Sequence, residues 1–295
     1  MKNNLNIAFC FFGQVRFFEV IEIYRNWRNR DPNVNIDMFI STWSDFPYEN
    51  EFEDFISINM IDVNDNNWIN FNTGYCLTSG ASLVTPIYHI IEVNKLRRDY
   101  ELKNKFKYDY VIFVRTDCLL SEQKFFESVF EFKTTDLIMD GLVKPFPSES
   151  GLYVITHDYV WMGSPEVIDI FIKEVYNSLE SYKATHNSKE GKKGYNEDKL
   201  FKNSGHSFFG TTIKRSKLPL DKLSWQGKAS GISGMVVRAH SDLGIFKRYP
   251  DISSDELIKK IEINRKNTDN WRYTSGSMSF SYPLHKVSKW KLKNG

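Results

Sequence analysis

A run of five consecutive apolar residues, Tyr110 to Val114, constrains the fold of this chain more than any other segment. The run is rich in β-branched and aromatic residues and is too short for a helix, so it predicts a strand buried on both faces. Such strands are typical of the centre of a parallel sheet covered by helices. Arg115, Thr116 and Asp117 follow at once. We expect these polar residues at the carboxyl edge of the sheet, where open α/β sheets bind ligands.

Segments before this strand alternate in the way that an α/β domain requires. The sequence predicts strands over residues 5–12, 34–41 and 55–63. It predicts helices over residues 17–29 and 82–103, the second from the helical spacing of its apolar residues. Because proline suits the first turn of a helix, Pro86 places the start of that helix near Thr85. Residues 64–67, rich in Asn and Asp, are expected to be poorly structured.

Segments after Asp117 continue the alternation. The sequence predicts a helix over 122–130, a strand over 137–140, a loop over 143–149, and two short strands over 153–156 and 159–162. His157 and Asp158 then fall in a loop between those short strands. Start signals predict a helix from Ser164 to about residue 182, and a second one over 254–263 with Ser253 or Ser254 as its N-cap. A mobile stretch over 186–194, a helix from 196 and a strand over 234–238 complete the prediction.

Two loops at the carboxyl edge carry candidate ligand-binding residues. Gly13, Gln14 and Arg16 follow the first strand, although the dinucleotide fingerprint GxGxxG is absent. Gln14 and Arg16 either face a nucleotide or lie on the surface without a ligand, and the residues alone do not separate these interpretations. Thr42 and Trp43 follow the second strand, where the tryptophan either stacks on a ligand ring or covers the sheet edge. The second interpretation is favoured for Trp43.

Composition narrows the class of protein. The chain has 295 residues, with 39 basic against 37 acidic side chains, which argues against nucleic acid as its main partner. We expect one α/β domain over residues 1–245 and a helical and aromatic extension over 246–295. Cys10, Cys76 and Cys118 show no metal-ligand spacing, so reduced thiols are favoured, with Cys10 and Cys118 in the core.

The order and spacing of four segments resemble glycosyltransferases of the GT-A fold, specifically bacterial and viral proteins related to lipopolysaccharide-biosynthesis glycosyltransferases. The segments are GQVR after the first strand, IDMFISTW, YDYVIFVRTD and HDYVWMGSPEVIDIF, followed by a later NEDKLF and VVRAH. The resemblance spans residues 5–245 and implies a Rossmann-like, open, mostly parallel twisted sheet flanked by helices. It also implies an enzyme that moves a sugar from a nucleoside-diphosphate donor, by default a UDP-sugar, to a glycan, lipid-linked or protein acceptor.

The resemblance assigns a role to each matching residue. GT-A enzymes hold Mn²⁺ or Mg²⁺ against the donor diphosphate with an Asp-x-Asp motif, and Arg115 replaces the first aspartate here. The metal ligands that it implies are Asp117 and His240, and metal dependence stays open because of Arg115. Arg115 itself either supplies charge to phosphate or pairs internally with a carboxylate. The implied donor-binding residues are Gly13, Gln14, Arg16, Thr42, Trp43, Arg115, Thr116 and Asp117.

The implied chemistry is a single inverting displacement. Asn196-Glu197-Asp198 is similar to the motif that carries the catalytic base in many inverting members, with Asp198 as base and Glu197 orienting the acceptor. Two acids in a first helical turn are also common as simple complements of the helix dipole. Asp158 is the rival base, and His157, Asp158 and Trp161 are the implied acceptor contacts.

Two other functions remain in view at this stage. A sugar nucleotidyltransferase uses a related sheet, although the glycine-rich loop of such enzymes is absent from the first unit. A catalytically degenerate carbohydrate-binding protein would also tolerate the incomplete aspartate motif. The apolar stretch from Ile7 to Phe12 is too short for a signal peptide or a membrane span, so a cytoplasmic location is expected, in the host if the protein is viral. The basic end around Trp290 predicts either a weak peripheral membrane contact or, as the favoured interpretation, a solvated tail.

Overall fold

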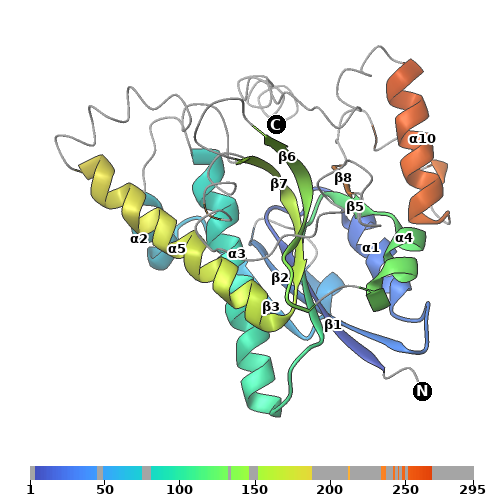
Figure 1. Ribbon diagram of the computed structural model, residues 1–295, viewed down its shortest axis with the longest axis horizontal. Helices are drawn as coiled ribbons and strands as arrows, with labels where there is room; N and C mark the ends of the chain where they lie inside the picture. The colour runs from blue at the N-terminus through green and yellow to red at the C-terminus, as the bar shows by residue number, and fades with distance from the viewer. Residues whose placement is uncertain are drawn as a thin grey trace.

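A six-stranded mixed sheet forms the centre of the protein, in the strand order β3-β2-β1-β4-β7-β6 (Figure 1). The computed structural model describes residues 4–44, 49–74, 81–131, 134–145, 152–187, 212, 234–236, 242, 245, 248–249 and 252–267. Strands β1 (Leu5–Phe12), β2 (Val34–Trp43), β3 (Ser57–Ile61) and β4 (Tyr110–Arg115) pair in parallel. Strand β7 (Leu152–Gly163) is antiparallel to both β4 and β6 (Ile138–Pro145). The expected open, mostly parallel α/β sheet is therefore confirmed.

Helices cover both faces of this sheet (Figure 1). One face carries α1 (Phe18–Trp27), α4 (Glu122–Ser128) and α10 (Ser254–Asn267), and the other carries α3 (Ala81–Asn104) and α5 (Pro165–Asn187). Smaller elements are η1 (Glu49–Phe52), α2 (Asn66–Gly74), η2 (Val129–Glu131), and the two-stranded sheet of β5 (Cys118–Leu120) and β8 (Gly234–Val236). Successive side chains of a strand point to opposite faces, so each strand contributes to two separate hydrophobic cores.

Strand β4 lies in the middle of the sheet, between β1 and β7. Its residues Val111 to Val114 are completely buried, which explains why the apolar run has no polar interruption. Its one antiparallel neighbour, β7, was not evident from the sequence. Cys10 and Cys118 are also buried and reduced, as predicted, whereas Cys76 lies outside the described residues.

The starts of two helices differ from what the sequence predicted. Helix α3 begins at Ala81 and contains Pro86, although Pro86 was expected in the first turn. The buried side chains of Ile87, Ile90 and Val93 anchor α3 against the sheet, and this tertiary burial outweighs the propensity penalty of proline. Residues 64–67 were expected to be poorly structured, but α2 begins at Asn66.

The start of α2 has a local cause. The Asp65 carboxylate accepts hydrogen bonds from the backbone N–H groups of Asn67 (2.8 Å) and Trp68 (3.1 Å). Aspartate is a preferred N-cap, so Asp65 satisfies two N–H groups that a helix start leaves without partners. Trp68 then packs against Tyr88 of α3, with 5.3 Å between ring centroids, which fixes α2 on the α3 face.

The sequence predicted that His157 and Asp158 lie in a loop between two strands, and this prediction is wrong. They belong to the continuous strand β7, which pairs Thr156 with Gly141 and Trp161 with Met139 of β6. Four residues of β7 therefore lie opposite the single residue between Met139 and Gly141, and this register shift is a bulge. The polar residues that suggested a loop mark the bulge instead.

The predicted starts of two later helices are confirmed, whereas β6 runs from Ile138 to Pro145 and so takes in residues 143–145, which were expected in a loop. Helix α5 begins at Pro165, and Ser164 Oγ accepts a hydrogen bond from the backbone N–H of Val167 at 3.4 Å. It runs to Asn187 and so takes in the start of the stretch that was expected to be mobile; residues 188–194 lie outside the described residues. Helix α10 has Ser253 as its N-cap, since Ser253 Oγ accepts from the N–H of Glu256 at 3.3 Å.

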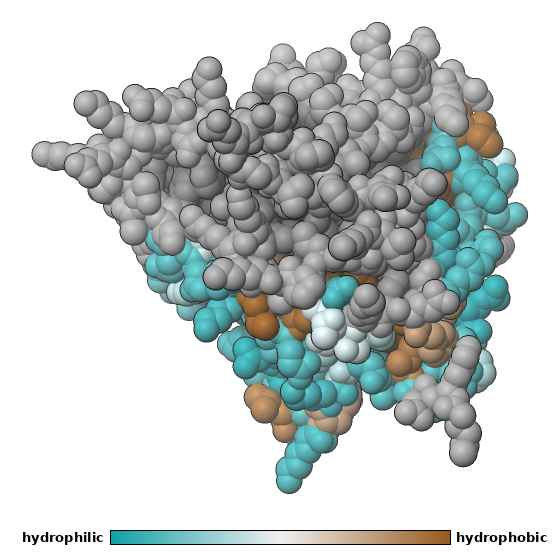
Figure 2. Space-filling model, in the orientation of Figure 1, coloured by the Kyte–Doolittle hydropathy of each residue, from teal (hydrophilic) through white to brown (hydrophobic). Residues whose placement is uncertain are grey.

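Helix α10 belongs to the main body of the protein, although the sequence assigned it to an extension. Leu257 and Ile261 are buried in the core on the α1 face. The outward side of α10 is largely hydrophilic (Figure 2), as its many charged residues require. None of the helices in the described part of the chain combines the length and the apolar composition needed to span a bilayer.

Candidate functional site

The strand order reverses between β1 and β4, and this switch point defines the candidate site. From β1 the chain proceeds outward through β2 and β3 and then returns through α3 to β4, on the other side of β1. The carboxyl ends of β1 and β4 are neighbours, with Phe12 paired to Arg115. In open α/β sheets ligands bind in the crevice at such a point, because the connecting loops diverge there.

The first loop is fixed to this edge by backbone contacts. Gly13 donates its N–H to the carbonyl of Ser41 at 3.1 Å, and its φ of +95° is favourable for glycine alone. Thr116 donates its hydroxyl to the carbonyl of Gln14 at 2.6 Å and its N–H to the carbonyl of Phe12 at 3.2 Å. In the described structure Thr116 therefore joins the end of β4 to the loop after β1, and Gly13 ties that loop to β2.

Three charged side chains gather at this edge, and we call Arg16, Arg115 and Asp117 the edge cluster. Arg115 donates from Nε to Asp117 Oδ1 at 2.9 Å and from Nη2 to Oδ2 at 2.7 Å. Arg16 Nη1 lies 3.8 Å from Asp117 Oδ2. The Asp117 side chain is 4% exposed, whereas those of Arg115 and Arg16 are 23% and 55% exposed. Within the described residues the cluster therefore places two guanidinium groups against one buried carboxylate, with Arg16 as its most exposed member.

The predicted cation does not fit this arrangement of Asp117. Both carboxylate oxygens already accept hydrogen bonds from Arg115, and a second guanidinium lies nearby, so a divalent cation would face two positive charges. No group of three His, Cys, Asp or Glu side chains suited to a metal occurs among the described residues. His240 lies outside the described residues, so its metal role stays a prediction. The arrangement of the edge cluster suits an anion.

Thr42 and Trp43 face the interior rather than the edge. Thr42 is completely buried, which corrects the expectation that it contacts a donor. Trp43 packs edge-to-face on Trp68 and His89, with centroids 5.0 and 4.7 Å apart, as the sheet-covering interpretation predicted. His89 is itself buried, with Nδ1 3.0 Å from Ser41 Oγ. Burial lowers the pKa of His89 to about 4, so the imidazole is neutral near pH 7.

Of the three predicted acceptor residues, Trp161 lies in the core, and the backbone of His157 and Asp158 lies at the edge of the sheet where β4 ends. Trp161 is completely buried between Phe12 and Phe171, with centroids 5.6 and 5.5 Å away, which corrects the expectation that it contacts an acceptor. Val114, near the end of β4, pairs with Val160 of the antiparallel β7. The backbone of His157 and Asp158 therefore extends beyond the end of β4, on the same edge as Asp117.

Tyr24 of α1 is a positioning residue that the sequence did not reveal. Its hydroxyl donates to the carbonyl of Cys118 at 2.8 Å and accepts from the N–H of Leu120 at 3.0 Å. Burial raises the pKa of Tyr24, so the hydroxyl keeps its proton. Tyr24 thus holds β5, the segment directly after Asp117. A tyrosine on the buried stripe of a helix carries no sequence signal for such a role.

The candidate site is a charged edge formed by the loops after β1 and β4. The predicted catalytic pair, Glu197 and Asp198, lies outside the described residues. The described residues thus include the positions predicted to bind a donor, together with the backbone position of Asp158. A scan against models of known protein families finds no match to this chain, and a search of curated proteins finds no similar sequence.

Proposed function

We propose that this protein is a glycosyltransferase that transfers a sugar from a nucleoside-diphosphate donor, by default a UDP-sugar, to a glycan, lipid-linked or protein acceptor. The observation that carries the proposal is the edge cluster, which places two guanidinium groups around one buried carboxylate at the switch point of an open α/β sheet. Diphosphate groups bind where fixed positive charge meets the carboxyl edge of such a sheet.

Arg16 is the residue that we assign to the diphosphate. Its side chain is more than half exposed, and its distance of 3.8 Å from Asp117 exceeds that of a hydrogen bond. Asp117 orients Arg115 with two hydrogen bonds, so this second guanidinium is fixed before a ligand arrives. Pre-organised positive charge stabilises the charge that develops on the departing nucleoside diphosphate. In this proposal the two arginines supply that positive charge.

The transfer step follows the inverting scheme that the sequence resemblance implies. A hydroxyl oxygen of the acceptor attacks the anomeric carbon of the donor, while the bond from that carbon to the diphosphate oxygen breaks. Asp198 takes the hydroxyl proton, and the nucleoside diphosphate leaves with the electron pair of the broken bond. Asp158 is the alternative base, on the strength of its backbone position at the same edge.

Ligand binding tests the donor site directly. Calorimetry and thermal melts with uridine, guanosine, cytidine and adenosine diphosphates, each with Mn²⁺ or with EDTA, should identify one nucleotide that raises the melting temperature. We expect the Asp117→Ala variant to lose this binding, because Arg115 is no longer oriented. The matched control is Arg98→Gln, which removes an exposed arginine of α3 that lies 3.7 Å from Asp169. Absence of binding by every nucleotide would contradict the proposal and favour a degenerate carbohydrate-binding protein.

The same titrations decide how the diphosphate charge is neutralised. Equal affinity in Mn²⁺ and in EDTA would support neutralisation by the arginines. Affinity that requires Mn²⁺ would instead restore the metal role predicted for Asp117 and His240. Because both conditions use the same protein sample, the comparison is independent of protein stability.

Substitution of the proposed base tests the chemical step. We expect Asp198→Asn to lower the turnover of sugar transfer by roughly 100-fold or more while nucleotide affinity is kept, since a general base contributes that much to proton transfer. Asp158→Asn serves as the matched comparison. Full transfer activity in a folded Asp198→Asn protein would rule out Asp198, and a loss confined to Asp158→Asn would assign the base to β7.

A further inference from the structure

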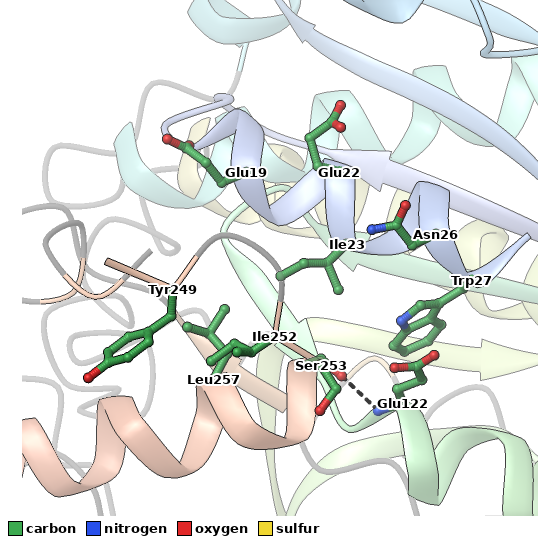
Figure 3. Close-up of a pocket in the computed structure, with 11 residues that line it drawn as sticks. Glu19, Glu22, Ile23, Asn26, Trp27, Glu122, Tyr249, Ile252, Ser253 and Leu257 are labelled. Carbon is green, nitrogen blue, oxygen red and sulfur yellow. Dashed lines mark hydrogen bonds between the residues drawn. The ribbon is translucent and has the colours of Figure 1, made fainter. Parts of the chain in front are cut away.

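A cavity of about 520 Å³ lies between α1 and α10, on the sheet face opposite α3 and α5 (Figure 3). Its lining comes from α1, from the first residue of α4, and from α10 with the segment before it: Glu19, Glu22, Ile23, Asn26, Trp27, Glu122, Tyr249, Ile252, Ser253, Ser254 and Leu257. None of these residues belongs to the edge cluster. Its volume is in the range of small-molecule sites.

The lining combines an apolar floor with an acidic rim. Ile23, Ile252 and Leu257 supply aliphatic surface between the two helices (Figure 3). Glu19, Glu22 and Glu122 supply three carboxylates, of which Glu22 forms an ion pair with Arg25 and Glu122 forms one with Arg30; no Lys or Arg is among the eleven lining residues. Negative charge around an apolar cavity favours a cation that carries an apolar chain.

Trp27 adds an independent indication that the cavity binds a ligand. The residue is 1% exposed, and its ring is held by Phe125 and Tyr24, with centroids 5.3 and 4.9 Å away. Its indole nitrogen faces the space between α1 and the α10 region (Figure 3), and this buried N–H has no acceptor among the described residues. A buried donor without a partner is costly, so an acceptor oxygen on a ligand would remove that cost.

Glu122 is the carboxylate best placed to meet a cation. Its side chain is 16% exposed, and its nearest described cation is Arg30, at 3.3 Å but itself 67% exposed. Burial raises the pKa of Glu122, the charge of Arg30 opposes this shift, and the charge of Asp255 adds to it. The backbone N–H of Glu122 donates to Ser254 Oγ at 3.0 Å, so the residue is fixed to the far wall of the cavity.

We propose that this cavity binds a small organic cation, namely an aliphatic amine that also carries a hydroxyl or carbonyl oxygen. The ammonium group pairs with Glu122, the oxygen accepts the indole N–H of Trp27, and the carbon chain covers Ile23, Ile252 and Leu257. The site goes beyond the proposed sugar transfer and does not rest on it, because the lining shares no residue with the edge cluster.

Three fragment probes of equal chain length test this assignment: aminopentanol, pentylamine and pentanediol. The readout is the indole N–H resonance of Trp27 in a spectrum of ¹⁵N-labelled protein, assigned by its absence in Trp27→Phe. We expect millimolar aminopentanol to shift this resonance, and pentanediol to bind roughly tenfold more weakly because it lacks the charge, a difference that corresponds to about 1.4 kcal/mol. We expect pentylamine to bind more weakly than aminopentanol and to leave the indole resonance nearly unchanged.

Matched variants distinguish a specific contact between the ligand and the Glu122 carboxylate from a general effect of negative charge on the protein. Glu122→Gln should weaken aminopentanol roughly tenfold, because it removes a charge-assisted hydrogen bond. Glu127→Gln, on the same helix but outside the cavity lining, should leave the affinity unchanged. The proposal is overturned if pentanediol binds as tightly as aminopentanol, if Glu122→Gln binds like the native protein, or if neither amine moves the Trp27 resonance. Nucleotide binding at the edge cluster is a separate measurement, so failure of one site leaves the other intact.

Discussion

Two arginine–carboxylate clusters in this protein differ in how deeply the arginine is buried and in how closely it contacts its carboxylate. We call Arg97, Asn94, Glu101 and Asp169 the buried cluster, which joins α3 to α5. Arg97 is completely buried and donates to Asn94 Oδ1 from Nε and Nη2, to Glu101 Oε2 at 2.6 Å, and to Asp169 Oδ1 at 2.5 Å. The edge cluster contains a side chain, Arg16, that is 55% exposed and only 3.8 Å from its carboxylate.

The difference separates an ion pair that supports the fold from one that is open to a ligand. In the buried cluster Arg97 is bonded on three sides and serves two carboxylates, of which Asp169 is 33% exposed and also lies 3.7 Å from Arg98. Burial raises the pKa of Glu101, and the charge of Arg97 opposes this shift. The edge cluster, counted over the described residues, has two guanidinium groups against one carboxylate, and it lies at the switch point of the sheet. An arginine is therefore informative about function only when its surroundings leave charge uncompensated and accessible.

Removal of Arg97 is the largest expected effect on stability. Arg97→Met leaves Glu101 and Asp169 near each other without their shared cation, so the free energy of unfolding should fall by roughly 3–5 kcal/mol. Arg98→Gln, its exposed neighbour on α3, should stay within about 0.5 kcal/mol of the native value. Chemical denaturation of both variants measures the difference. Equal stability of the two variants would contradict the contrast drawn between the clusters.

His89 provides a buried polar contact without charge. Burial lowers the pKa of His89 in the folded protein to about 4, below the ordinary histidine value of 6.5. Between these two pH values the unfolded chain therefore binds the proton more tightly than the folded protein does. His89 therefore makes its full contribution to the free energy of unfolding above pH 6.5, and this contribution is lost as the pH falls toward 4. At 1.36 kcal/mol per pKa unit the total loss is roughly 3 kcal/mol.

Melting temperatures measured from pH 7.5 down to pH 4.5 test this dependence. The native protein should lose stability steeply through that interval, and His89→Asn should lose less of it, even if the variant is less stable throughout. The same slope in both proteins would show that other groups dominate the acid response.

Substitution of Arg16 has the smallest expected effect on stability. It tests most directly whether the edge cluster differs from the buried cluster. Arg16→Gln should change the free energy of unfolding by less than about 0.5 kcal/mol, because the side chain is exposed and makes one long ionic contact. Its affinity for the nucleoside diphosphate should nevertheless fall roughly tenfold. Calorimetry beside denaturation measures both quantities on one sample. A destabilised variant with native affinity would make Arg16 a structural residue like Arg97.

Several elements were predictable because their cause is local. The apolar run of β4 and the serine and proline at the start of α5 indicate their structures through a few adjacent residues. The bulge in β7, the start of α3 and the antiparallel pairing of β7 were not predictable in this way. Each depends on which strand or helix packs against the segment, and that neighbour is distant in sequence.

The candidate site shows the same division. The residues after β1 and β4 indicated a ligand-binding edge, because parallel strands that end in polar loops meet at one side of a sheet. Only the tertiary structure shows that Arg115 is bonded to Asp117 and that Thr42 and Trp161 are buried. A residue type fixes what a side chain is able to bind, whereas packing decides which partner it has.

The sequence by itself therefore determined the α/β class, the central strand and the polar edge that follows it, since hydrophobic pattern and backbone preference act over a few residues. The tertiary structure decided that α10 joins the core, that a cavity with an acidic rim forms against α1, and that Arg16 and Arg115 both lie against Asp117. These properties depend on burial and on contacts between segments that are far apart along the chain. The hydrogen bond between Ser121 and Asp255, for example, joins residues that are 134 positions apart. Charge and accessibility are set by such neighbours.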